Sequence, residues 1–389
     1  MVIDAELRTV LQKVMKAFKK PVLVTRPYLP PIEDFKRGCE EIWNNQWLTN
    51  NGPTLQKFQK ALSEYLGVPE TNLALFNNGT LALELGYYAM GLAGGDVITT
   101  PFTFVATSHA LKRIGANPIF ADIDPETLCL DPAKVEKLIT PRTKAIVPVH
   151  VYGNVCDVEG FENLGEKYGV KIIYDAAHAF GVREFNHVGQ VEQAGKKLYE
   201  YGDMSMFSFH PTKLFHSCEG GLLVFKDAAV QEKLYELRNF AIHSETECVD
   251  VGSNAKMNEL QALMGLECLK KIDELLDCRR KIFLAYEEAF SESPNVKLIP
   301  YSCNKAYVPV LFRDFATREK VYEGLKSCNV FARRYFYPLL TDFAPYVYAK
   351  GVCPVAEDIA ARVLTLPTYY GLSIEDVKHV AEDVLEIIS

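Results

Sequence analysis

The sequence lacks the patterns that hold together small secreted folds and zinc-binding folds. Its ten cysteines are scattered, and none of them forms a C-x-x-C pair. This spacing indicates neither a zinc site nor a disulfide framework, and we predict no metal site. Reduced thiols in a cytoplasmic enzyme are the simplest interpretation.

The chain also lacks an excess of positive charge and any apolar run long enough to cross a membrane. Its formal net charge is −8 at pH 7, which argues against a nucleic-acid partner, because such proteins present a basic face. Charged residues interrupt residues 1–20, so this segment is not a signal peptide. The apolar spacing there predicts an amphipathic helix instead.

What the sequence does contain is a repeated alternation of short apolar segments with helical stretches. Residues of the classes that form cores make up 48% of the 389 residues, enough for a large folded domain. Most of the apolar segments are flanked by Gly, Asn or Asp. We predict seven strands in a mostly parallel sheet covered on both faces, a three-layer α/β sandwich. These strands are expected at 73–76, 97–99, 118–121, 145–151, 171–174, 204–208 and 221–225.

The pattern changes after residue 225. Helical spacing is expected at 228–240, 257–290 and 374–388, with a short strand at 306–312. We therefore predict a large α/β domain over residues 1–250, which includes the N-terminal helix and a proline-rich arm. A smaller C-terminal α+β domain is expected over residues 251–389.

Three polar residues follow two of the predicted strands closely. Asp175 ends one apolar segment, Ser208 ends the next, and Lys213 comes five residues later. In open α/β sheets, ligands bind at the carboxyl ends of strands. Pyridoxal phosphate requires a lysine for a Schiff base and an acid for its pyridine nitrogen. A lysine beside a pocket of low dielectric is also a nucleophile and a base, so these residues predict a site for this cofactor.

Other residues near strand ends have two interpretations each. Gly79 and Thr80 lie between a predicted strand and a predicted helix, where backbone N–H groups bind phosphate; the alternative is an ordinary helix cap by Asn78 or Thr80. Asp175 has a similar alternative as a helix N-cap. Phe104 either stacks on a ring or belongs to the core.

His178 follows Asp175 by three residues, which places it on the same side if the turn is helical. It either contacts the cofactor ring or is a satisfied structural histidine.

Taken together, these segments resemble the DegT/DnrJ/EryC1/StrS family of nucleotide-sugar aminotransferases, which have PLP fold type I. The resemblance extends over residues 26–385. The segments with the strongest resemblance are 175–181 (Asp-Ala-Ala-His-Ala-Phe-Gly), 207–213 (Phe-Ser-Phe-His-Pro-Thr-Lys) and 219–221 (Glu-Gly-Gly), supported by 47–53, 101–107 and 252–262.

The resemblance implies cofactor contacts for a set of residues. Lys213 would form the Schiff base and carry the proton, and Asp175 would pair with the pyridine nitrogen. The other implied contacts are Phe104 and His178 on the ring, Gly79, Thr80 and Ser208 on the phosphate, and Asn254 on the phosphate of a neighbouring subunit. A homodimer with a shared active site would then be the smallest active unit.

The resemblance also implies the reaction. An amino group would move from glutamate to a nucleotide-linked keto-sugar, with dTDP-4-keto-6-deoxyhexose favoured, in a cytoplasmic pathway such as polysaccharide biosynthesis. Charges in the segment 333–338 would meet the pyrophosphate of that substrate. The alternatives are a 3-keto sugar nucleotide as the acceptor, an amino-acid aminotransferase, and a non-catalytic, PLP-binding regulatory protein. Lys213 argues against the related sugar dehydratases, which carry a histidine in its place.

Overall fold

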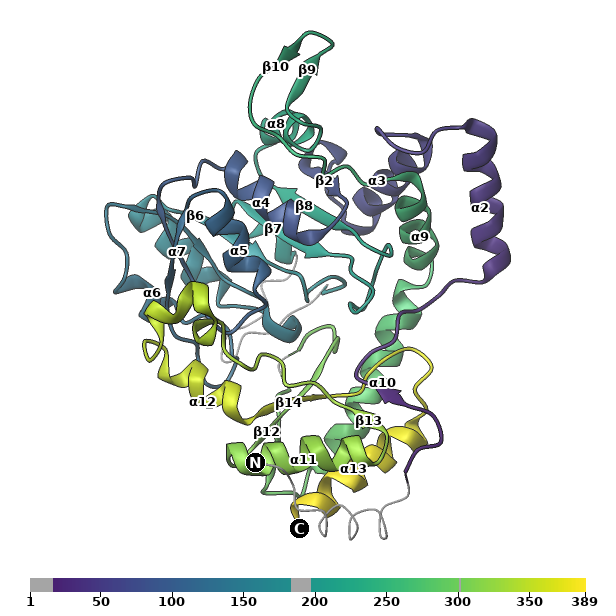
Figure 1. The fold of residues 1–389 in the computed structure, drawn as a ribbon, viewed down its shortest axis with the longest axis vertical. Helices are drawn as coiled ribbons and strands as arrows, with labels where there is room; N and C mark the ends of the chain where they lie inside the picture. Colours follow the sequence, from purple (N-terminus) through teal and green to yellow (C-terminus); the bar gives the residue numbers. More distant parts are fainter. Residues whose placement is uncertain (1–16, 183–196, 301) are drawn as a thin grey trace.

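The computed structural model describes residues 17–182, 197–300 and 302–389. The helix expected in residues 1–20 lies almost entirely outside this part of the chain. A seven-stranded sheet lies at the centre of the upper part of the molecule (Figure 1). In the order of the sheet, its strands are β2 Leu73–Phe76, β8 Gly221–Phe225, β7 Met204–Ser208, β6 Lys171–Asp175, β5 Thr143–Val147, β3 Asp96–Thr99 and β4 Asn117–Phe120.

The predicted sheet is confirmed, and each of the seven predicted segments forms one of its strands. Strand β8 runs antiparallel to both β2 and β7, whereas the other neighbouring strands pair in parallel. Strand β5 is shorter than expected, because it ends at Val147 and the chain then turns through a short helical segment at Val151–Gly153. The parallel strands all direct their carboxyl ends toward one edge of the sheet.

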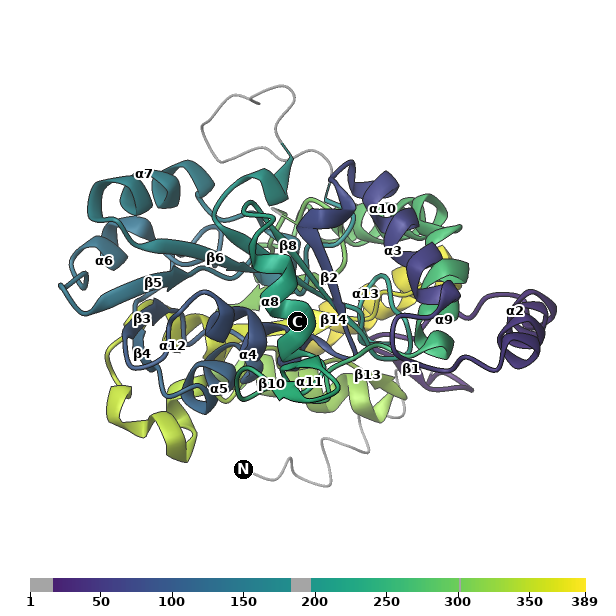
Figure 2. The same ribbon diagram turned by 90° about the horizontal axis from the view of Figure 1, so that it is seen from above.

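Successive strand residues pack into different cores, as the two-residue period of a strand requires. Ile172 packs with the helices of one face and Ile173 with those of the other. The two layers lie on opposite sides of the sheet in Figure 2. The helices of the first face are α3 Pro53–Leu66, α7 Val158–Tyr168 and α9 Glu259–Leu269, with the short α6 Pro132–Glu136; those of the second are α4 Gly79–Ala89, α5 Ala106–Arg113 and α8 Val230–Leu237.

A second hydrophobic cluster lies in the lower part of Figure 1. It is built on a three-stranded antiparallel sheet, β11-β12-β14, and on helices of the C-terminal third. The arm after residue 20 also reaches it, since β1 pairs with β13. The division at residues 250 and 251 stays a prediction. The elements are β1 Val22–Leu23, α10 Ile272–Phe290, β11 Val296–Leu298, β12 Val308–Phe312, α11 Phe315–Ser327, β13 Val330–Phe331, β14 Val363–Leu366 and α13 Ile374–Ile388.

The remaining elements lie around these clusters. Helix α2 Ile32–Asn45 packs beside α9, and α12 Pro354–Arg362 follows the loop that covers the edge of β4. The hairpin of β9 Ile242–Ser244 and β10 Glu247–Cys248 projects from the top of the molecule in Figure 1. Of the helices in the described ranges, none combines the length and the apolar character that a membrane span requires.

Asp383 provides a test of the C-terminal core. Its side chain on α13 is only 3% exposed, its Oδ1 lies 3.7 Å from His379 Nε2, and its Oδ2 has no hydrogen-bond partner in the described part of the chain. Burial raises the pKa of Asp383 from 3.8 to about 6. Because the folded-state pKa is the higher one, the ionised carboxylate destabilises the fold above pH 6, and this cost vanishes below its unfolded pKa.

We therefore expect Asp383→Asn to raise the free energy of unfolding by about 1 to 2 kcal/mol at pH 8. The gain should disappear below a pH of about 4. Urea unfolding between pH 4 and pH 8 measures this difference, with Glu375→Gln as an exposed control on the same helix. A variant that is less stable than the parent chain at pH 8 would contradict the prediction.

Candidate active site

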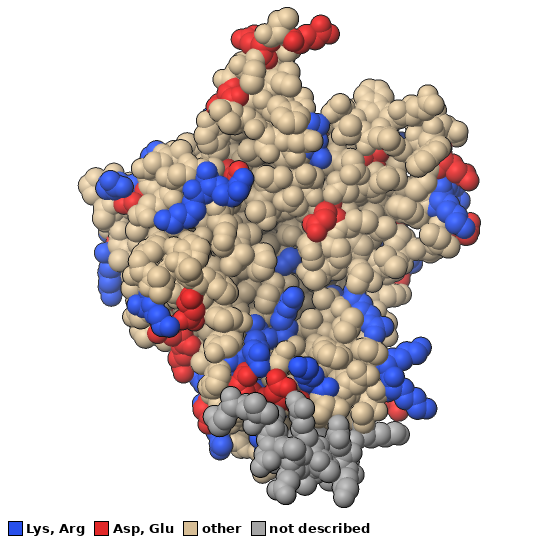
Figure 3. Space-filling view, in the orientation of Figure 1, with Lys and Arg blue, Asp and Glu red and all other residues tan. Residues whose placement is uncertain are grey.

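A cavity of about 310 Å³ opens at the carboxyl ends of β2, β6 and β7. Figure 3 shows this face of the molecule hollowed between its upper and lower parts, with Lys and Arg side chains gathered around the hollow. Seven of the eight residues singled out in the sequence line the cavity: Gly79, Thr80, Phe104, Asp175, His178, Ser208 and Lys213.

Asp175 is the last residue of β6 and is buried, with 4% of its surface exposed. Its Oδ2 accepts a hydrogen bond from Thr107 Oγ1 at 2.7 Å, and its Oδ1 accepts one from the N–H of Ala177 at 3.1 Å. Burial raises the pKa of Asp175, whereas these two donors and the positive charge of Lys213 act to lower it. The carboxylate therefore caps the turn that follows β6 and also lines the cavity, so both interpretations of this residue describe the structure.

A second hydroxyl supports the one that reaches Asp175. Thr103 Oγ1 and Thr107 Oγ1 lie 2.8 Å apart, and both side chains are buried. Since Thr107 donates its proton to the carboxylate, its oxygen accepts from Thr103. This chain of hydroxyls favours the charged form of the carboxylate and opposes the effect of burial, which raises its pKa.

His178 is held in one orientation. Its Nδ1 accepts the backbone N–H of Tyr152 at 3.0 Å, so the neutral ring carries its proton on Nε2. Burial lowers the pKa of His178 well below its ordinary value, and the charge of Lys213 lowers it further. The ring lies parallel to that of Phe336, with 6.0 Å between centroids and 5° between planes. This histidine is a neutral, flat wall of the cavity.

Phe104 forms part of the cavity lining from the loop before α5. It is 53% exposed, whereas Phe102 two residues earlier is fully buried in the core. The exposed ring leaves an apolar face directed at the cavity, and the alternative of a core residue applies to Phe102 instead.

The start of α4 lies close to the end of β7. Asn78 caps the helix by accepting the N–H of Leu81 at 2.9 Å, so the alternative of an ordinary cap is also realised. The N–H groups of the first turn, including those of Gly79 and Thr80, have no partner within the helix itself. A Cβ at Gly79 would lie only 3.2 Å from Ser208 Cβ. The absence of a side chain at Gly79 therefore allows the helix N-terminus and the Ser208 hydroxyl to share one corner of the cavity.

These features fit pyridoxal phosphate. The donors at the corner of Gly79 and Ser208 suit a phosphate, and the buried carboxylate suits a protonated ring nitrogen. Lys213 supplies the amine in the same cavity. No group of three or more potential metal ligands is arranged to hold an ion within the described ranges.

Asn254 is the one residue singled out that does not line this cavity. It is exposed, and its carbonyl oxygen lies 3.4 Å from Nδ2 of Asn77, next to the start of α4. Its role toward a neighbouring subunit stays a prediction.

Several residues of the site were not singled out individually in the sequence. Tyr152, Tyr307 and Phe336 surround His178, and Tyr307 is 94 residues away from its partner Lys213. Thr107 lies within the segment 101–107 that carried part of the family resemblance, but nothing in that segment indicated its bond to Asp175.

The two arginines of the segment 333–338 differ in position. Arg333 lines the cavity, whereas Arg334 pairs with Glu319 and Glu323 on α11. Of the two, only Arg333 lies where a bound substrate can meet it.

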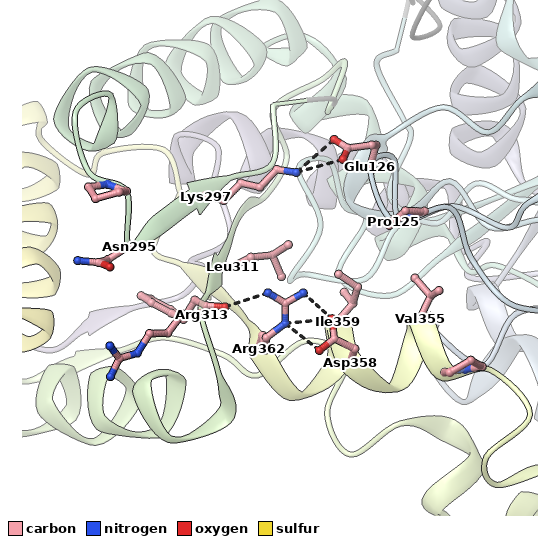
Figure 4. Close-up of a pocket in the computed structure, with 13 residues that line it drawn as sticks. Pro125, Glu126, Asn295, Lys297, Leu311, Arg313, Val355, Asp358, Ile359 and Arg362 are labelled. Carbon is pink, nitrogen blue, oxygen red and sulfur yellow. Dashed lines mark hydrogen bonds and ion pairs between the residues drawn. The ribbon is translucent and has the colours of Figure 1, made fainter.

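A larger cavity of about 550 Å³ lies elsewhere, between α12, β11 and the loop after β4 (Figure 4). Four of its charged side chains bond in pairs: Lys297 lies 3.2 Å from Glu126, and Arg362 bonds to Asp358. Arg313 pairs with Asp314, which lies outside the lining. It holds neither a lysine near a buried carboxylate nor a helix N-terminus beside a hydroxyl. We therefore assign the reactive site to the smaller cavity.

This chain is similar to known aminotransferases over almost its whole length. A profile of the DegT/DnrJ/EryC1/StrS aminotransferase family matches residues 31–385. The dTDP-4-amino-4,6-dideoxy-D-glucose transaminase of Shigella dysenteriae is 42% identical over 377 residues, which cover 95% of this chain and 100% of that protein. GDP-perosamine synthase of Caulobacter vibrioides is 32% identical over 351 residues, covering 87% and 91%. The solved structure of DesI in the presence of its TDP-sugar product has a TM-score of 0.88 and 34% identity, covering 99% of this chain and 97% of that one.

Proposed function

Because this chain belongs to the DegT/DnrJ/EryC1/StrS aminotransferase family, whose enzymes depend on pyridoxal phosphate, we propose that it moves an amino group from glutamate to a dTDP-linked 4-keto-6-deoxy sugar. The observation that carries the proposal is a single cavity that unites Lys213, the buried Asp175 and the start of α4. Two similar proteins support this choice of sugar nucleotide. The Shigella relative is a transaminase of dTDP-4-amino-4,6-dideoxy-D-glucose, and DesI was solved in the presence of its TDP-sugar product.

The bound cofactor supplies an electron sink that carries an amino group between donor and acceptor. Asp175 would hold a proton on the ring nitrogen, since each of its two oxygens already accepts one hydrogen bond and these bonds favour its ionised form. The N–H groups of Gly79 and Thr80 and the hydroxyl of Ser208 would bind the phosphate. Phe104 and the neutral ring of His178 would enclose the cofactor ring and exclude water.

Lys213 would attach the cofactor and move the proton that amino transfer requires. Its amine lines the cavity and is close enough to influence the pKa values of both Asp175 and His178, which supports a position beside both side chains. Arg333 at the cavity wall offers a guanidinium to the pyrophosphate of the sugar nucleotide.

The active unit in this proposal is a homodimer. Asn254 would reach the phosphate in the cavity of a second copy of the chain, which agrees with its exposure and with its place outside its own cavity. Apolar side chains around it are exposed as well, as expected of a surface that a second copy covers: Phe240, Ile242, Val249 and Val251. We also propose that this biosynthetic enzyme is cytoplasmic.

The test is turnover of the purified protein with pyridoxal phosphate, glutamate and dTDP-4-keto-6-deoxyglucose. We expect a dTDP-linked 4-amino-4,6-dideoxy sugar and 2-oxoglutarate, identified by mass spectrometry. The alternative amino acceptors to be tested in the same assay are the 3-keto isomer, the GDP-linked 4-keto-6-deoxymannose and 2-oxo acids. A higher kcat/KM with any of these would replace the proposed acceptor, and aspartate or glutamine in place of glutamate tests the donor in the same way.

A further inference from the structure

A short segment of the C-terminal part, residues 302–307, is bonded to the wall of the cavity. Ser302 Oγ donates to the carbonyl oxygen of Tyr152 at 2.8 Å. The N–H of Cys303 donates to the carbonyl oxygen of Gly153 at 3.0 Å. Asn304 Nδ2 donates to the carbonyl oxygens of His178 and Phe180, at 2.8 and 2.9 Å. These bonds place the segment beside the loops that follow β5 and β6.

The end of this segment is fixed from the other side. Arg279 of α10 is buried, and its guanidinium donates to the carbonyl oxygens of Ala306, at 3.3 Å, and Thr368. The N–H of Ala306 donates to Asn304 Oδ1 at 3.1 Å. The backbone just before Tyr307 is therefore fixed by hydrogen bonds to Arg279 on one side and to Asn304 on the other.

The ring of Tyr307 is enclosed by aromatic neighbours. Its centroid lies 4.5 Å from that of His178, 5.7 Å from that of Tyr152 and 5.9 Å from that of Tyr335. Burial raises the pKa of Tyr307, so the phenol keeps its proton although Arg279 and Arg333 act to lower that pKa. The side chain is thus a neutral phenol with little freedom to move.

The hydroxyl of Tyr307 is placed against the catalytic amine. Lys213 Nζ lies 3.4 Å from Tyr307 Oη and donates to it. Lys213 lines the main cavity and Tyr307 does not; Tyr307 instead lines a small cavity with Thr212 and Arg333. The amine therefore lies between the main cavity and the phenol, which contacts it from behind.

We propose that Tyr307 is a positioning residue for Lys213, an inference that rests on the proposed function. The phenol oxygen accepts one N–H of the amine and holds it at the cavity wall whenever it is not attached to the cofactor. In the course of a transamination cycle the amine must leave the cofactor and return to it. Tyr307 speeds the reattachment of the amine to the cofactor, because a contact from the C-terminal part of the chain keeps the free amine in place.

The test uses Tyr307→Phe, which removes the hydroxyl and keeps the ring. Cofactor-free protein is mixed with pyridoxal phosphate, and the rate of covalent attachment is followed by absorbance. We expect the variant to attach the cofactor about threefold to tenfold more slowly, the size of one hydrogen bond. Its kcat should fall by a similar factor, with KM for the sugar nucleotide unchanged. Tyr286→Phe is the matched control, because that buried hydroxyl donates to the carbonyl oxygen of Pro367 and not to a group of the main cavity.

The outcomes separate the inference from the function on which it rests. A Tyr307→Phe protein that attaches the cofactor at the parental rate would overturn the role of Tyr307 and leave the proposed function in place. A purely structural role would lower the melting temperature without slowing attachment, and this result would overturn the inference as well. If the parent chain itself attached no cofactor, the proposed function would fail first.

Discussion

Replacing Lys213 by alanine should abolish amino transfer, with kcat lowered by a factor of roughly 10⁴ or more. In the proposed function, the substitution removes both the amine that attaches the cofactor and the group that moves the proton. It also removes the positive charge that lowers the pKa values of Asp175 and His178. The amount of amino-sugar product formed at fixed times measures the loss of activity. The absorbance band of the covalently attached cofactor should also be absent from the variant.

A second variant at Lys213 separates the amine from the charge, and a variant at a surface lysine is the control. Lys213→Arg keeps a positive charge but has no amine that can lose its proton near neutral pH, so it should be as inactive as the alanine variant. Lys226 is an exposed lysine that follows β8 and pairs with Glu162 on α7. The Lys226→Ala variant should retain the parental rate. Turnover by Lys213→Ala within tenfold of the parent chain would contradict the assignment of the nucleophile.

Asp175→Asn should give the second largest loss, roughly 10²- to 10³-fold in kcat, the size expected when a buried charge that opposes a developing charge is removed. The amide has nearly the shape of the carboxylate but cannot hold a proton on the ring nitrogen. Binding of the cofactor should weaken as well, which equilibrium dialysis of the variant measures. A variant with parental kcat would show that the carboxylate acts only as the cap of the turn after β6.

Thr107→Val is the matched control for this carboxylate. It removes the hydroxyl that donates to Oδ2 and leaves the charge in place. Because that hydrogen bond lowers the pKa of Asp175, its loss should raise this pKa further. Activity requires the ionised form, so the acid limb of the pH–rate profile should move to higher pH while the plateau above it changes little.

Much of the fold could be predicted because its signals are local. A strand that is buried on both faces needs a short apolar segment, and a helix that covers it needs a period of 3.6 residues. The seven strands were therefore readable, whereas the break between α9 and α10 within the predicted helix 257–290 was not. The short α9 packs on α3, and α10 extends into the C-terminal cluster, so the break reflects two different packing partners.

The candidate site divides along the same line. By itself, the sequence determined that Asp175, Ser208 and Lys213 follow neighbouring strands of one parallel sheet, and parallel strands direct their ends to a common edge. Only the tertiary structure decided that Thr107 donates to Asp175, that Asn304 connects residues 178 and 180 to the C-terminal part, and that Tyr307 contacts Lys213. These contacts join residues that are 68 to 126 positions apart. Local periodicity carries no information over such separations, because tertiary packing brings the partners together. Thr107 and Asp175 meet within the layers of the seven-stranded sheet, whereas Asn304 and Tyr307 reach the site from the C-terminal part of the chain.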